Sequence, residues 1–119
     1  MRTISGAVVF TILVAFVFEG ITLAAGDATK GQATFQQLCS SCHGATGKGD
    51  GAMGAALNPK PKDLSDKAYT ASMKDDYLVK LIKGGGQAVG KSPVMPNVGS
   101  TLKDGEVTDV IAYIRSLAK

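Results

Sequence analysis

One short stretch, CSSCH at residues 39–43, holds both cysteines and the only histidine of this 119-residue chain. The clustering constrains the fold because no cysteine remains elsewhere to form a stabilising disulfide. The stability of the fold therefore has to come from an apolar core or from a group bound at this stretch. Three kinds of site use such a cluster: a structural zinc site, a dithiol redox centre and the covalent attachment point of a haem.

The first 25 residues have the pattern of a secretory signal peptide. Arg2 is followed by an uncharged run from Thr3 to Phe18, and small residues follow at Thr22, Ala24 and Ala25. The run is shorter than the roughly 20 apolar residues that a membrane-spanning helix needs. We therefore predict a cleaved leader over residues 1–25, a single domain over 26–119 and a periplasmic location. The alternative is that the leader remains as a membrane anchor.

The part of the chain that follows the leader is short of large apolar side chains. Its aromatic residues are Phe35, Tyr69, Tyr77 and Tyr113, and the chain has no tryptophan. A domain of this size buries only a modest fraction of its surface. We therefore expect a bound apolar cofactor to complete the core.

Helical spacing of apolar residues is the main structural signal after the leader. Helices are predicted over residues 28–44, 74–84 and 104–119, with Asp104 as the expected cap of the last one. Long loops rich in glycine and proline connect these segments, and none of them has a convincing strand pattern. An all-α fold is predicted, with loops that wrap around a bound group.

The composition around residues 39–43 separates the three kinds of site. Structural zinc takes four protein ligands, and the chain has no second cysteine or histidine cluster. A dithiol centre of the C-x-x-C kind belongs to a fold with a sheet, for which no strands are predicted. C-x-x-C-H is the attachment signature of c-type haem. Cys39 and Cys42 lie on one turn and can both reach the haem, and His43 can then reach its iron.

Residues 28–118 resemble a bacterial class I c-type cytochrome, a monohaem cytochrome c. The resemblance is carried by GQATFQQLCSSCHG, NPKPKDL, SPVMPN and DVIAYIRSL. It implies about four short helices and long Gly/Pro loops wrapped around one covalently bound haem c. It also implies that the first and last helices cross, with Gly31 and Phe35 meeting Tyr113.

The resemblance implies that His43 and a methionine are the two axial ligands of the iron. A methionine ligand raises the reduction potential of such a haem. Met95, between two prolines in SPVMPN, is the preferred candidate, and Met73 is the alternative. Met53 lies only ten residues after His43 and is expected to be too close to the histidine side.

Two further site residues are expected from the same resemblance. The carbonyl of Pro59, or alternatively Pro61, is expected to accept a hydrogen bond from His43 Nδ1. Such a bond would leave Nε2 free for the iron. Leu64 is expected to pack against the edge of the haem ring.

The implied function is that of a soluble, exported electron carrier whose single haem alternates between Fe(III) and Fe(II). Such a protein is not an enzyme, and it is expected to be a monomer that docks redox protein partners at its exposed haem edge. One alternative is a fixed cytochrome c subunit of a larger membrane-associated oxidoreductase complex. Another is a haem-based sensor or enzyme, which would need an open sixth position on the iron.

The net charge is a modest +3, from 13 basic and 10 acidic residues, and loss of Arg2 and Glu19 with the leader leaves 12 − 9 = +3. So small a charge does not favour nucleic acid as a partner. It is enough to help guide an acidic redox protein to the haem edge. The lysines expected around that edge are Lys48, Lys60, Lys62, Lys80, Lys83 and Lys91.

Overall fold

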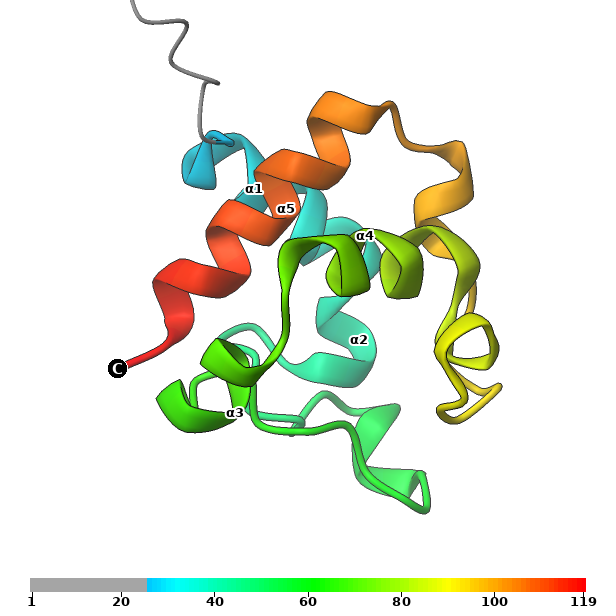
Figure 1. The fold of residues 1–119 in the computed structure, drawn as a ribbon. Coiled ribbons are helices and arrows are strands. Elements are labelled where there is room, and N and C mark those ends of the chain that lie inside the picture. Colours follow the sequence, from blue (N-terminus) through cyan, green and yellow to red (C-terminus); the bar gives the residue numbers. More distant parts are fainter. Residues whose placement is uncertain (1–25) are drawn as a thin grey trace, which may run out of the picture.

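The computed structural model describes residues 26–119, so the predicted leader lies outside the described residues. Five α-helices follow one another along this part of the chain: α1 (Ala28–Leu38), α2 (Ser40–His43), α3 (Lys67–Ser72), α4 (Asp75–Gly84) and α5 (Asp104–Leu117) (Figure 1). Three short 3-10 helices lie between them: η1 (Gly54–Ala56), η2 (Gly86–Val89) and η3 (Val98–Thr101). Residues 26–119 contain no strand, which confirms the all-α prediction. Over the same range, no helix has the length and apolar character needed to cross a membrane.

Two helices differ from their predicted form. The helix expected over residues 28–44 is interrupted at Cys39, and its last turn becomes the separate helix α2. Helix α3 was not predicted, because six residues are too few to show a helical repeat. Its start is fixed by Asp66, whose carboxylate accepts a 3.0 Å hydrogen bond from the Tyr69 amide.

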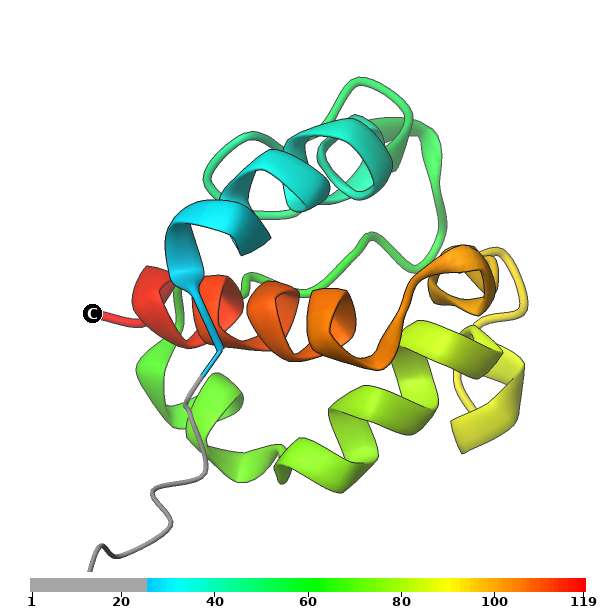
Figure 2. The ribbon, with the colours of Figure 1, turned by 90° about the horizontal axis from the view of Figure 1, so that it is seen from above.

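Helices α1 and α5 pack directly against each other, as predicted for the first and last helices (Figures 1 and 2). The contact is so close that a Cβ atom on Gly31 would lie 1.9 Å from the backbone oxygen of Asp109. One turn later, the rings of Phe35 and Tyr113 meet edge to face with their centroids 5.1 Å apart. Only glycine therefore fits at position 31, and the predicted crossing through these three residues is confirmed.

The start of α5 is tied to α4. The N-cap is Lys103, and its amide donates a 2.8 Å hydrogen bond to the Glu106 carboxylate. Asp104 is the first residue inside the helix, so its predicted role as the cap is wrong by one position. Its carboxylate instead forms an ion pair with Lys83 of α4. This pair, through its hydrogen bond and its charge, lowers the pKa of Asp104.

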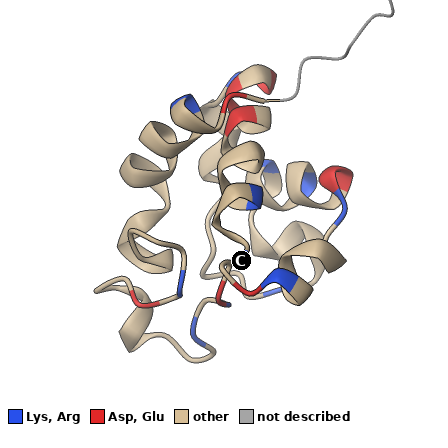
Figure 3. Ribbon diagram, turned by 90° about the vertical axis from the view of Figure 1, so that its left-hand side faces the viewer, with Lys and Arg blue, Asp and Glu red and all other residues tan. Residues whose placement is uncertain are grey.

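The other end of α5 holds the junction between α3 and α4. The Arg115 guanidinium donates hydrogen bonds to the backbone oxygens of Thr70 and Met73, and it forms a 2.7 Å ion pair with Asp75. A planar guanidinium can make several such bonds at once, whereas an ammonium group is a point charge. The remaining charged residues lie at the surface, separated by long uncharged stretches of ribbon (Figure 3).

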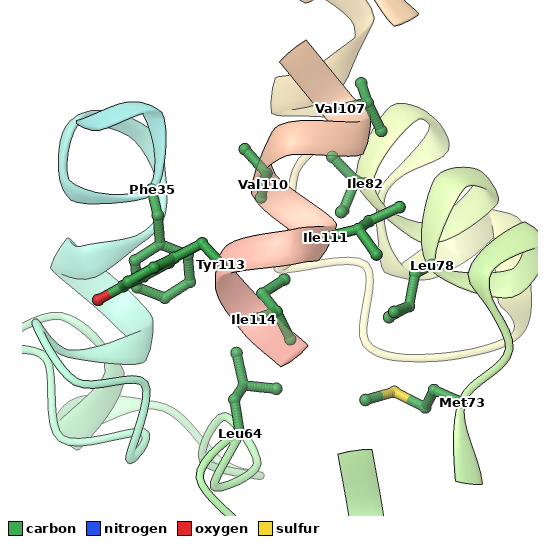
Figure 4. Packing of buried hydrophobic residues seen from close by; sticks show 10 residues of the cluster. All are labelled: Phe35, Leu64, Met73, Leu78, Ile82, Val107, Val110, Ile111, Tyr113 and Ile114. Carbon is green, nitrogen blue, oxygen red and sulfur yellow. The ribbon is translucent and has the colours of Figure 1, made fainter. Parts of the chain in front are cut away.

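The core lies between α1, α4 and α5 (Figure 4). It consists of ten buried hydrophobic residues: Phe35, Leu64, Met73, Leu78, Ile82, Val107, Val110, Ile111, Tyr113 and Ile114. The partly buried Cys39 packs against this cluster. The segment that carries the cysteines and the histidine is therefore anchored directly to the core.

Candidate haem site

Helix α2 gathers the two thiols and the imidazole. Cys39 stands at the junction with α1, and its backbone oxygen accepts hydrogen bonds from the amides of Cys42, at 3.3 Å, and His43, at 2.9 Å. The three side chains therefore project from a single turn. Both cysteines are half-buried and form no disulfide. The predicted grouping of these residues at one turn is present in the structure.

Glycines let the following loop pack closely against α2. A Cβ atom on Gly51 would lie 2.4 Å from the Ser41 backbone oxygen, and one on Gly54 would lie 2.0 Å from that of Cys42. The loop is also bonded to the end of α2, since the Gly49 amide donates a 2.7 Å hydrogen bond to the His43 oxygen. The sequence indicated only that the glycines of this loop oppose regular secondary structure. Its close approach to α2 depends on tertiary packing.

The His43 side chain has an unusual environment. Its ring is half-buried, with its centroid 6.3 Å from that of Phe35, and burial lowers the pKa of the imidazole. Among the described residues, His43 Nδ1 is the buried side-chain nitrogen or oxygen that has no hydrogen-bond partner. A buried polar atom without a partner costs about 1–3 kcal/mol. A neutral, enclosed imidazole suits a ligand of haem iron, because a metal binds histidine in its neutral form.

The state of the thiols argues against a dithiol redox centre. Burial, together with the neighbouring Cys42, raises the pKa of Cys39 to about 11. The nucleophilic cysteine of a dithiol oxidoreductase has a lowered pKa, so that it reacts as the thiolate. The all-α fold of residues 26–119 also lacks the sheet on which such centres are built. Both observations oppose this interpretation of the motif.

The arrangement of possible ligands argues against zinc. Residues 26–119 contain no group of three or more His, Cys, Asp or Glu side chains placed to hold a metal ion. A structural zinc site needs four protein ligands in a tetrahedral arrangement. The residues of α2 therefore fit covalent haem better than they fit zinc or dithiol chemistry.

The two candidate methionines have different surroundings. Met73 is 7% exposed and belongs to the core, just after the end of α3 (Figure 4). Met95 is half-buried in the loop between η2 and η3. The backbone oxygen of Met95 accepts a 3.0 Å hydrogen bond from the Gly86 amide, and its amide donates to Ser92 at 3.3 Å. Its loop is therefore held to η2, just after the end of α4, and in Figure 1 it is separate from α2.

A cavity of about 460 Å³ lies beside α3 and the first turn of α4. Its walls include Tyr69, Met73 and Tyr77, and Lys91 comes from the loop that leads to Met95. Cys39, Cys42 and His43 are not part of its lining. The cavity therefore lies between Met73 and the segment that precedes Met95, and no residue of α2 lines it.

The two proline candidates also differ. Pro59 is exposed, whereas Pro61 is half-buried. The backbone oxygen of Pro61 would lie only 2.2 Å from a Cβ atom on Gly49. Its ring faces Gly54, which lies against Cys42. Neither proline oxygen accepts a hydrogen bond from His43 in the structure, because Nδ1 has no partner. Pro61 is nevertheless the proline that contacts Gly49 and Gly54, and Gly49 is hydrogen-bonded to the end of α2.

Leu64 lies where the glycine-rich loop meets the core. Its side chain is 8% exposed, and its amide donates a 2.7 Å hydrogen bond to the Gly47 oxygen. The buried hydroxyl of Thr70 donates a 2.8 Å bond to the Leu64 oxygen. The sequence analysis missed the roles of Thr70 and of Arg115, because their partners are backbone oxygens that no residue pattern identifies.

Comparisons with known proteins identify the family of the chain. The family model described as Cytochrome c matches residues 28–118. The cbb3-type cytochrome c oxidase subunit FixP of Bradyrhizobium diazoefficiens is 31% identical to the chain over 91 residues. The aligned region covers 76% of this chain and 28% of FixP, so the chain spans less than a third of that relative. The family match over residues 28–118 shows that the chain belongs to the cytochrome c family, whose cofactor is covalently bound haem c.

Proposed function

We propose that the protein is an exported one-electron carrier with a single haem c bound to Cys39 and Cys42. The observation that carries the proposal is the state of His43, a half-buried neutral imidazole whose buried Nδ1 has no partner and which follows the half-buried thiol of Cys42. When bound, the haem supplies a reversible one-electron change between Fe(III) and Fe(II). The role of the chain is to hold this group rigidly and to limit access of water to it.

His43 and Met95 are proposed as the axial ligands. His43 shares one turn with both cysteines, so a haem attached there would have this imidazole available as a ligand of its iron. Met95 is favoured over Met73 because it lies in a loop outside the buried core. Its side chain can therefore turn toward a bound group without disturbing that core. Met73 belongs to the buried core, although it also lines the cavity beside α3, and moving its side chain away would remove contacts from that core.

Pro61 is proposed in place of Pro59 as the acceptor for His43 Nδ1. Its support is its position beside Gly49 and Gly54, two glycines whose backbones approach α2. Such an acceptor would satisfy the buried nitrogen and would fix the tautomer that leaves Nε2 free. Leu64 is proposed to pack against the ring edge, since it is buried where the same loop joins the core.

Export is proposed from residues 1–25, which carry the leader pattern and precede a family of domains that are typically exported. A periplasmic fraction that contains a polypeptide beginning near residue 26, identified by N-terminal sequencing, is the expected result. A membrane-bound form that retains residue 2 would indicate an anchor instead.

The second candidate function is that of a fixed electron-transfer subunit in a membrane-associated oxidoreductase. It is favoured by the similarity to FixP, which is described as a subunit of a cbb3-type oxidase. Size-exclusion chromatography of gently extracted membranes distinguishes the two candidates. A free carrier elutes alone at the size of a small monomer, and a subunit elutes with its complex.

Carbon monoxide tests whether the protein carries electrons or binds a substrate at the iron. If Met95 occupies the sixth position, the reduced protein should bind little or no carbon monoxide near neutral pH. It should still be oxidised completely by one equivalent of a one-electron dye. Rapid, stoichiometric binding of carbon monoxide by the native reduced protein would contradict the carrier function and favour a sensor or an enzyme.

A further inference from the structure

Arg115 of α5 is bonded to the backbone of a segment that is distant in the sequence. Its guanidinium donates hydrogen bonds to the backbone oxygens of Thr70 and Met73, at the end of α3. It also forms a 2.7 Å ion pair with Asp75, in the first turn of α4. The last carbonyl groups of a helix have no partner within the helix itself. Arg115 therefore supplies donors at the end of α3 and fixes this end relative to α5.

Thr70 continues this connection into the interior. Its side chain is 1% exposed, and its hydroxyl donates a 2.8 Å hydrogen bond to the Leu64 oxygen. The Leu64 amide in turn donates a 2.7 Å bond to the Gly47 oxygen. Two residues further along the same loop, the Gly49 amide donates a 2.7 Å bond to the His43 oxygen. A connected series of hydrogen bonds therefore runs from α5, through α3 and the glycine-rich loop, to the end of α2.

The connection holds two buried side chains in place. Leu64 and Met73 are both buried and belong to the core. In Figure 4 they extend toward each other from different segments, below Ile114 in the view. Met73 also lines the cavity of about 460 Å³ beside α3. A shift of Met73 would open this part of the core to the cavity, and a shift of Leu64 would loosen its contact with the glycine-rich loop.

We infer that Arg115 and Thr70 are positioning residues for electron transfer. They fix Leu64 and Met73 and thereby limit the access of water to the haem. The inference rests on the proposed function, which places Leu64 against the edge of the haem ring. Solvent access to a haem influences its reduction potential. Because Fe(III) carries one more positive charge than Fe(II), entry of water favours Fe(III) and lowers the potential.

The ion pair of Arg115 does not account for this role. Asp75 is 75% exposed, so water screens the attraction between the two charges. The bonds to the backbone oxygens instead depend on the shape of the donor group. A planar guanidinium can bridge two oxygens and a carboxylate at once, whereas the ammonium group of lysine is a point charge. Arginine is therefore required for its geometry as well as for its charge.

Arg115→Lys tests this requirement, because it changes the donor geometry and keeps the charge. The complete haem-containing protein is titrated with redox mediators near neutral pH. At the midpoint potential of the native protein, the ratio of reduced to oxidised haem should fall at least about threefold in the variant. This change is equivalent to about 28 mV for a one-electron couple.

Thr70→Val tests the interior part of the connection, because it removes the hydroxyl and nearly keeps the shape of the side chain. We expect the potential to fall, as in Arg115→Lys. The exchange rate of the Leu64 amide, measured by NMR in the reduced protein, should rise at least about tenfold. Thr70→Ser restores the hydroxyl and should return both quantities toward their native values.

Two control variants separate positioning from other effects. Asp75→Asn removes the ion pair and leaves both backbone bonds of Arg115, so the potential and the Leu64 exchange rate should stay close to native. Val107→Ala creates a cavity in another part of the core, eight residues earlier in α5 and about 12 Å along its axis. It should lower the unfolding midpoint and leave the potential unchanged.

The inference is overturned if Arg115→Lys and Thr70→Val lower the unfolding midpoint, as Val107→Ala does, but leave both the potential and the Leu64 exchange rate unchanged. A shift in Asp75→Asn as large as that in Arg115→Lys would also overturn it, because the ion pair would then be responsible. If Thr70→Val does not fold, Arg115→Lys at its partly exposed position decides the question.

Failure of the proposed function gives a different result. A native protein without covalent haem has no haem absorption and no midpoint potential to titrate. The exchange rate of the Leu64 amide still reports on the hydrogen bonds of Thr70 in that case.

Discussion

At the scale of single residues, the site depends on a histidine and a cysteine that burial keeps uncharged. His43 is kept neutral by burial, and its Nδ1 has no partner among the described residues. Cys39 keeps its proton, because burial raises the pKa of its thiol to about 11. These properties are unfavourable for a nucleophile or for a surface residue. They are suited to a segment that binds an apolar, iron-containing group through its sulfurs and its imidazole.

The identity of the sixth ligand is a prediction at this scale. Met95→Ala is expected to abolish the weak far-red charge-transfer band that sulfur ligation gives to the oxidised protein. It should also lower the reduction potential, because a methionine ligand raises the potential of a cytochrome c. Absorption spectroscopy and a redox titration measure the two effects.

Met73→Leu is the matched control for Met95→Ala. The volume-conserving change at this buried position should cost less than about 1.5 kcal/mol of stability and should leave the band in place. Loss of the band in the Met73 variant, with retention in the Met95 variant, would assign the ligand to Met73.

At the scale of secondary-structure elements, the molecule is organised by α5. This helix crosses α1 at Gly31, pairs with α4 through Asp104 and Lys83, and holds the junction of α3 and α4 through Arg115. Each contact involves a different part of α5 and a different kind of interaction. The loops of the candidate site are therefore attached to helices whose relative positions are fixed by their contacts with α5.

The crossing of α1 and α5 is tested by Gly31→Ala. The added Cβ would lie 1.9 Å from the Asp109 oxygen, so the helices have to separate, at a cost of about 1–3 kcal/mol. Gly105→Ala is the control, because a Cβ at that position in α5 meets nothing within 4 Å. It should stabilise the protein by up to about 1 kcal/mol. Denaturant unfolding of both variants measures the difference, and equal midpoints would show that the close approach at Gly31 has no energetic effect.

The pair between Lys83 and Asp104 predicts a pH dependence. Because the pair lowers the pKa of Asp104, its stabilising effect is complete above the ordinary pKa of 3.8 and is lost as pH falls through the lower folded value. Asp104→Asn should therefore be less stable than the native protein at neutral pH, and the difference should shrink below about pH 4. The effect is expected to be small, since both groups are exposed. A difference in unfolding midpoint that grows with acidity would contradict this assignment.

The predictability of the molecule from its sequence follows the range of the interactions. The helical stripes are local signals, and they correctly predicted an all-α fold. The crossing of the end helices at Gly31 was predicted only from the resemblance to the cytochrome c family. The break at Cys39, helix α3 and the bonds of Arg115 depend on contacts between distant residues, and they were not predicted. The choice between Pro59 and Pro61 also depends on such contacts, because only the folded chain brings Pro61 beside Gly49 and Gly54.

At the scale of the whole molecule, residues 26–119 form a small helical domain with a modest core. The ten buried hydrophobic residues include only two aromatic ones, Phe35 and Tyr113. A haem attached at α2 would add a large apolar surface to this core and would join α2 to the loop of Met95. The fold and the cofactor are therefore expected to stabilise each other.

Covalent attachment of the haem is tested most directly by mass spectrometry of the exported protein after acid–acetone extraction, which removes haem that is held only by coordination. We expect the polypeptide to stay coloured and to be heavier than its sequence by the mass of one haem. The peptide that contains Cys39 and Cys42 should carry the added mass. A colourless polypeptide at the mass of its amino acids alone, or one with the two cysteines joined as a disulfide, would contradict haem attachment at α2.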